Sequence, residues 1–168
     1  MTPALPEARE LLELLAARGW SIATAESLTG GLLSSAIVDV AGASAHMRGG
    51  VVAYDTRAKR ELLGVDAGLL DEHGPVHPEV ARQMAGGVRR ALRLDGADAE
   101  VGLSTTGIAG PVSPDGQPVG TVYVGVSTPE GDRVDHAVID GDRDRVRHET
   151  VRLALRLAIT ALRDGVRE

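Results

Sequence analysis

Helical and extended segments alternate along the chain, and this alternation restricts the fold more than any other feature of the sequence. Apolar residues recur at helical spacing in some segments and form short runs bounded by Gly, Pro or Asp in others. The last two strands are joined by Pro129-Glu130-Gly131, which predicts a hairpin. The expected order is helix 7–18, strand 20–24, helix 31–40, strand 49–54, a helix starting at residue 55 or 56, a short helix 66–72, a helix starting at 77–78, strand 98–105, strands 119–128 and 133–139, and helix 144–162. We therefore predict an α/β fold, a three-layer α/β/α sandwich with a mixed sheet.

The length fits one domain over residues 1–168. Apolar residues make up 43% of the chain, yet there is no Phe, one Trp and only two Tyr. The core must therefore be built from Leu, Val, Ile and Ala.

Charge and cysteine content exclude several classes of protein. The net charge is −6 and aromatic residues are scarce, so we expect no nucleic-acid partner. The chain has no Cys, which excludes disulfides and thiolate metal sites. No apolar stretch approaches the length of a membrane span and no signal peptide is evident, so we expect a cytoplasmic protein without a membrane partner.

One basic residue differs from all the others. Of the 18 basic residues 17 are Arg, and Lys59 is the single Lys. Arg stays protonated at any usable pH, whereas a Lys amine can lose its proton when its pKa is lowered. The alternative is that Lys59 is an ordinary surface residue left by codon bias.

Ser27 lies between a predicted strand and a predicted helix, just before Thr29, Gly30 and Gly31. A hydroxyl at such a turn is presented beside backbone N–H groups that can bind an oxyanion or a phosphate. Taken alone, the local sequence favours Ser27 or Thr29 as the N-cap of the helix over a catalytic role.

A nucleophilic serine needs a base, and none of the five His residues stands at a convincing strand end. Lys59 lies early in a helix between Arg57 and Arg60, where the helix dipole, the like charges and burial would all lower its pKa. Tyr54, at a strand end, could relay the proton or orient the amine. Thr56 is a competing nucleophile, although we expect it to cap the helix.

Two further segments suggest anion binding. The loop from Gly107 to Pro111 offers backbone donors after a strand, and Arg143 offers a guanidinium fork that suits phosphate or carboxylate. Arg143 could instead pair with a neighbouring Asp. Neither His73 with His77 nor the Asp residues at 140–144 has metal-ligand spacing, so we predict no metal and no cofactor.

Together these segments resemble the CinA C-terminal domain family. The resemblance covers residues 7–163 and rests on five ordered motifs: residues 24–31, residues 49–54 with Lys59 and Leu63-Gly64-Val65, residues 104–111, residues 118–122, and Gly141-Asp142-Arg143.

The resemblance implies an amidase that converts nicotinamide mononucleotide to nicotinic acid mononucleotide and ammonia. It implies Ser27 as the nucleophile, assisted by Tyr54 and Lys59, and a homodimer or larger homo-oligomer. Within this hypothesis Thr29, Gly30 and Gly31 hold the oxyanion, while Thr106, Gly107 and Arg143 hold the ribose phosphate of the small-molecule substrate. Three rivals remain: a non-catalytic nucleotide-binding module, an amidase for another carboxamide, and a structural oligomerisation domain.

Overall fold

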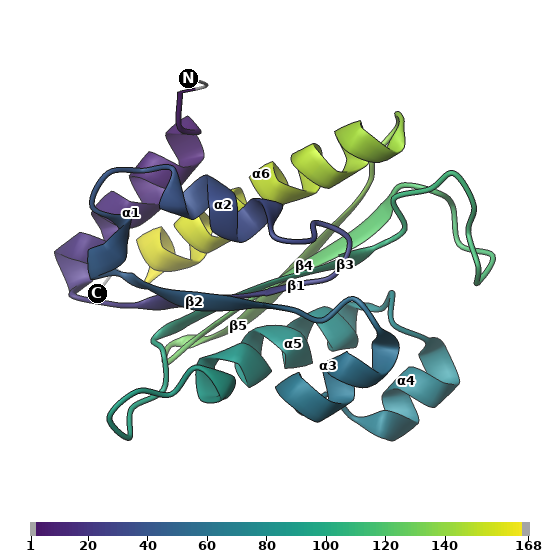
Figure 1. The fold of residues 1–168 in the computed structure, drawn as a ribbon, viewed down its shortest axis with the longest axis horizontal. Helices are drawn as coiled ribbons and strands as arrows, with labels where there is room; N and C mark the ends of the chain where they lie inside the picture. The colour runs from purple at the N-terminus through teal and green to yellow at the C-terminus, as the bar shows by residue number, and fades with distance from the viewer. Residues whose placement is uncertain (1–2, 166–168) are drawn as a thin grey trace.

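Five strands form one mixed sheet in the order β2-β1-β3-β4-β5 (Figure 1). The structure, a computed structural model, describes residues 3–165. The strands are β1 (Ile22–Glu26), β2 (Met47–Val52), β3 (Val101–Gly107), β4 (Thr121–Thr128) and β5 (Gly131–Val138). β1 runs parallel to β2 and to β3, whereas β3–β4 and β4–β5 are antiparallel pairs. The mixed sheet and the late hairpin are as the sequence predicts.

Helices cover both faces of this sheet (Figure 1). One face carries α1 (Pro6–Arg18), α2 (Leu32–Val38) and α6 (Arg143–Asp164), with the 3₁₀ turn η1 (Ala43–Ala45) after α2. The opposite face carries α3 (Thr56–Leu63), α4 (Ala67–His73) and α5 (Pro78–Ala91). The predicted three-layer α/β/α sandwich is therefore confirmed.

The core consists of two aliphatic layers, one on each face of the sheet, as the scarcity of aromatic residues requires. The first joins α1, α2 and α6 to the sheet through side chains such as Leu11, Leu33 and Leu155. The second joins α3, α4 and α5 to it through side chains such as Leu63 and Met84. Burying these side chains supplies most of the free energy that holds the layers together.

The strand boundaries differ from the predicted ones by about two residues. β1 begins at Ile22 rather than Trp20, because Gly19 ends α1 with a left-handed conformation and the N–H of Trp20 still donates to the carbonyl of Leu15. All five residues of β1 are buried. A strand buried on both faces has no polar alternation to mark its ends in the sequence.

Three connecting segments meet where β1 and β3 end. The N–H of Ser27 donates to the carbonyl of Thr105 at 3.1 Å, and the N–H of Ala53 donates to the carbonyl of Glu26 at 2.8 Å. The start of α6 reaches the same edge, because Arg143 donates to the carbonyl of Gly110. Carboxyl ends of parallel strands are the usual ligand sites of α/β folds, and all the candidate residues gather at this edge.

Candidate functional site

A tight turn after β1 places Ser27 at the end of the strand. The N–H of Gly30 donates to the carbonyl of Ser27 at 3.1 Å, which closes the turn. Gly30 and Gly31 have φ values of +54° and +103°, which residues with a Cβ atom rarely adopt. The glycine pair therefore allows the chain to leave the strand sharply and enter α2, with Ser27 only 8% exposed.

Glu26 stabilises this turn from inside, and its role was not evident from the sequence motifs. Its carboxylate is fully buried and accepts five hydrogen bonds: from the hydroxyl groups of Thr29 and Ser34 and from the N–H groups of Gly31, Leu33 and Ser34. Glu26 thus satisfies the first N–H groups of α2, and the prediction that Ser27 or Thr29 is the N-cap is wrong. The available signal was an acidic residue in an otherwise uncharged buried strand, since a buried charge needs partners.

Lys59 projects from the first turns of α3 toward Ser27. Asp55, not Thr56, caps this helix by accepting from the N–H of Arg57. The Lys59 side chain is 1% exposed, and its Nζ atom lies 3.0 Å from Ser27 Oγ, 2.7 Å from the Ala53 carbonyl and 3.4 Å from the Tyr54 carbonyl.

In the protonated amine three N–H bonds match these three oxygen acceptors, and in the neutral amine the contact with Ser27 can reverse its direction. A neutral amine has two N–H bonds and one lone pair. The two N–H bonds can be directed to the two carbonyl oxygens, which leaves the lone pair for the proton of the Ser27 hydroxyl. The arrangement brings a potential base and a potential nucleophile into direct hydrogen-bond contact.

Burial lowers the pKa of the Lys59 amine from its ordinary value of 10.5 to about 8, because the charged form loses its hydration, while the nearby Asp55 carboxylate opposes the shift. The flanking arginines are engaged elsewhere, Arg57 with Asp55 and Arg60 with Glu61. Burial is therefore the main cause of the lowered Lys59 pKa, and the expected contribution of the two arginine charges is not found.

Tyr54 lies at the site, but its hydroxyl does not join Lys59 to Ser27. The side chain is 61% exposed, and its hydroxyl accepts from Arg143 Nη2 at 3.1 Å. Only the backbone carbonyl of Tyr54 faces the Lys59 amine. The structure thus corrects the predicted proton relay, since the amine reaches Ser27 without it.

Arg143 connects Tyr54 to the loop after β3. Its Nη1 atom donates to the Gly110 carbonyl at 2.9 Å, and its side chain is exposed rather than engaged with Asp142 or Asp144. Leu28, next to Ser27, shares a buried apolar cluster with Ala109 of this loop. The loop therefore lies directly beside the serine turn.

Two predicted phosphate-binding residues are committed to other contacts. Thr106 is buried, and its hydroxyl donates to the Pro75 carbonyl at 2.7 Å. Gly107 belongs to β3, and a Cβ atom there would lie 2.8 Å from the Thr121 carbonyl oxygen, so the glycine serves the close approach of β4. Of the three predicted residues, only Arg143 presents an exposed side chain to this edge.

The glycine N–H groups are likewise engaged, which corrects the predicted oxyanion donors. Gly30 donates to the Ser27 carbonyl and Gly31 to the Glu26 carboxylate. Within the described residues, the N–H groups of Leu28 and Thr29 in the same turn have no hydrogen-bond acceptor. These two groups remain available to a ligand at Ser27.

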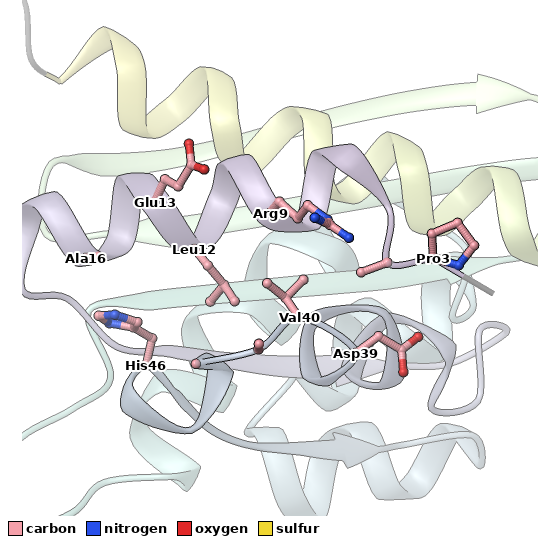
Figure 2. A pocket seen from close by; sticks show the side chains of 11 residues that line it. Pro3, Arg9, Leu12, Glu13, Ala16, Asp39, Val40 and His46 are labelled. Carbon is pink, nitrogen blue, oxygen red and sulfur yellow. The ribbon is translucent and has the colours of Figure 1, made fainter. Parts of the chain in front are cut away.

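A large cavity of about 760 Å³ lies elsewhere, between α1 and the segment after α2. Arg9, Leu12 and Glu13 of α1 line it together with Asp39, Val40 and His46, and Figure 2 shows Leu12 directed toward Val40. Neither Ser27 nor Lys59 lines it. The reactive pair, and not this cavity, therefore identifies the candidate active site.

Residues 3–165 contain neither a cluster of metal-ligand type nor a helix of membrane-spanning type. No three His, Asp or Glu side chains in this part of the chain gather closely enough to hold a metal ion. No helix described there combines the length and the apolar character needed to cross a membrane.

Comparison with known proteins agrees with the motifs. The family model of the CinA C-terminal domain matches residues 5–162. A CinA-like protein of Frankia casuarinae is 46% identical over 147 residues, which cover 88% of this chain and 33% of the relative. A CinA-like protein of Anaeromyxobacter sp. is 47% identical over 163 residues, which cover 96% of this chain and 37% of the relative. The chain thus spans about a third of the length of these curated relatives.

A solved structure has the same fold. The crystal structure of the competence damage-inducible protein A (ComA) from Klebsiella pneumoniae superposes with a TM-score of 0.85 at 33% identity, covering 93% of this chain and 94% of that chain. Because the family model spans almost the whole chain and relatives and structure agree with it, the chain belongs to the CinA C-terminal domain family.

Proposed function

We propose that this protein is an amidase that hydrolyses the carboxamide of nicotinamide mononucleotide to nicotinic acid mononucleotide and ammonia. The observation that carries the proposal is the 3.0 Å contact between the buried amine of Lys59 and the hydroxyl of Ser27. A buried lysine whose pKa is lowered to about 8 supplies a fraction of neutral base near pH 7 and mostly neutral base above pH 8, and the motifs shared with the family favour this substrate.

The reaction begins when the lone pair of Lys59 takes the hydroxyl proton of Ser27. Ser27 Oγ attacks the carboxamide carbon and forms a tetrahedral intermediate whose oxygen carries the negative charge. The protonated Lys59 then donates its proton to the leaving nitrogen, the carbon–nitrogen bond breaks and ammonia departs. Lys59, neutral again, takes a proton from water, and the hydroxide formed attacks the acyl carbon. Lys59 then returns this proton to Ser27 Oγ as the ester bond breaks and the acid leaves.

The N–H groups of Leu28 and Thr29 are the proposed donors to the intermediate oxygen, in place of Gly30 and Gly31. Each well-placed donor of this kind contributes about 3 kcal/mol to the transition state. Their proposed role follows from their lack of an acceptor and from their place in the Ser27 turn.

Recognition of the nucleotide is assigned to Arg143 and Tyr54. Arg143 has an exposed guanidinium beside Gly110, which suits the 5′-phosphate. Tyr54 offers an exposed ring, one of only three aromatic side chains in the chain, against which a pyridinium ring can stack.

Ammonia release tests the proposal. The wild-type protein is given nicotinamide mononucleotide, nicotinamide riboside, nicotinamide and an aliphatic carboxamide. We expect release with the mononucleotide, weaker release without the phosphate, and none from Ser27→Ala. The matched pair Lys59→Arg and Arg60→Lys exchanges the two side chains at neighbouring positions of α3, and only Lys59→Arg should abolish release.

Three outcomes would contradict the proposal in different ways. Nucleotide binding without ammonia release would indicate a non-catalytic binding module. Faster release from another carboxamide would leave the chemistry in place and replace the substrate. Undiminished release by Ser27→Ala would exclude the serine nucleophile.

A further inference from the structure

Arg147 holds the serine turn from the side of α6. Its half-buried guanidinium donates from Nε to the Leu28 carbonyl at 2.9 Å and from Nη2 to the Thr29 carbonyl at 3.2 Å. No carboxylate of the described residues forms an ion pair with it. The guanidinium thus binds the backbone carbonyls of the two residues that follow the proposed nucleophile.

This binding sets the direction of the Thr29 N–H. In a trans peptide the carbonyl of one residue and the N–H of the next point in opposite directions. Because Arg147 holds the Leu28 carbonyl toward α6, the Thr29 N–H must point away from α6. The bond from the Gly30 N–H to the Ser27 carbonyl closes the turn, and the Thr29 N–H belongs to this same turn and has no acceptor among the described residues.

Arg147 contacts this turn from outside, whereas Glu26 binds it from inside. Gly30 and Gly31 both have positive φ, and glycine restrains the backbone less than any other residue. The Arg147 guanidinium packs against this region, since a Cβ atom on Gly30 would lie 3.4 Å from Arg147 Nη2. A charged fork with two acceptors fixes the orientation of the Leu28–Thr29 peptide more firmly than a single neutral bond can.

We infer that Arg147 is a positioning residue that keeps the Thr29 N–H directed at the oxygen of the tetrahedral intermediate. The inference rests on the proposed serine chemistry but adds a residue that never touches the substrate. Its contribution is confined to the transition state, because the guanidinium is bonded to the turn and not to the nucleotide-binding edge.

Two variants separate geometry from charge. Arg147→Lys keeps the positive charge but loses the two-carbonyl fork, and Arg147→Met keeps only the apolar stem. We expect both to lower kcat about tenfold to a hundredfold, as displacement of a catalytic group by about 1 Å does, with KM changed less than about threefold. The rise of the rate near pH 8 should stay in place, because Lys59 is unaltered.

Arg156→Met is the matched control. Arg156 lies on the same helix and pairs with Glu7 of α1, so this variant measures the stability cost of losing one α6 arginine. It should keep the wild-type kcat. A kcat loss equal to that of Arg147→Met would assign the effect to α6 as a whole and overturn the inference.

A fluorophosphonate probe distinguishes this inference from the substrate assignment. Lys59 takes the hydroxyl proton of Ser27, and Ser27 Oγ forms a bond to phosphorus as the phosphorus–fluorine bond breaks and fluoride leaves. The phosphoryl oxygen then occupies the oxyanion position. If the probe labels wild-type Ser27 and labels Arg147→Lys at least tenfold more slowly, positioning is supported even when no carboxamide is hydrolysed. Equal labelling rates would overturn the inference with the amidase intact, and an unlabelled wild-type Ser27 would overturn both.

Discussion

The Nζ atom of Lys59 lies 3.0 Å from the Oγ atom of Ser27, although the two residues are 32 positions apart in the chain. Ser27 directly follows β1, and the Lys59 side chain reaches it from α3. Everything proposed for the chemistry depends on this contact between one buried amine and one hydroxyl.

The pH dependence of the reaction should follow the Lys59 amine. Its pKa of about 8 means that roughly a tenth of the molecules carry the neutral base at pH 7 and roughly nine tenths at pH 9. We therefore expect kcat/KM for ammonia release to rise about tenfold between these pH values. A rate profile that is flat across this range would exclude Lys59 as the base.

The free energy of unfolding should also respond to this amine. Between pH 8 and 10.5 the unfolded chain binds more protons at Lys59 than the folded chain does. The free energy of unfolding therefore rises with pH in this window, and the buried charged amine destabilises the fold most below pH 8. The total rise is roughly 3 kcal/mol. Urea unfolding at pH 7.5 and 10.5 should show this rise in the wild type but not in Lys59→Met, and an identical rise in both would contradict the buried charge.

Tyr54→Phe should retain most of the activity. The hydroxyl contacts Arg143 and not Ser27, while the exposed ring is kept by the substitution. We expect kcat within about threefold of the wild type and a modest rise in KM, measured by ammonia release. A proton relay through this hydroxyl would instead lower kcat by about a hundredfold or more.

Adjacent glycines of α5 test how the scaffold places Lys59. A Cβ atom on Gly87 would lie 1.9 Å from the carbonyl oxygen of Leu63 in α3, whereas on Gly86 it would make only ordinary contacts. Gly87→Ala should therefore push α3 away, lower the free energy of unfolding by about 1–3 kcal/mol and reduce activity. Gly86→Ala should be neutral or stabilising by up to about 1 kcal/mol, and equal effects of the two substitutions in thermal unfolding would contradict this account.

The sequence predicted the fold class because the helical stripes and the late hairpin are local features. It also pointed to Lys59, the single lysine, and to Ser27, at a strand–helix turn, and the resemblance to the family favoured them as the proposed base and nucleophile. The strand ends were misplaced because buried strands lack an alternating pattern.

The fine structure of the site depends on contacts between distant segments, which local patterns do not encode. Thr106 has the right residue type for binding phosphate, yet its hydroxyl is used by Pro75, 31 positions away. Gly30 and Gly31 fit an oxyanion hole by composition, yet their N–H groups close the turn and bind Glu26. Arg147 was indistinguishable in sequence from the other arginines of α6, because only the packing of α6 brings it to the serine turn.

The single lysine offers a direct test of the central claim. Lysine labelled with ¹³C at Cε gives one side-chain resonance, which needs no assignment because Lys59 is the only lysine in the chain. Its chemical shift, followed against pH, reports the pKa of this amine in the folded protein. The account predicts a midpoint of about 8, whereas a midpoint near 10.5 would mean that the amine stays protonated at neutral pH and cannot take the proton of Ser27.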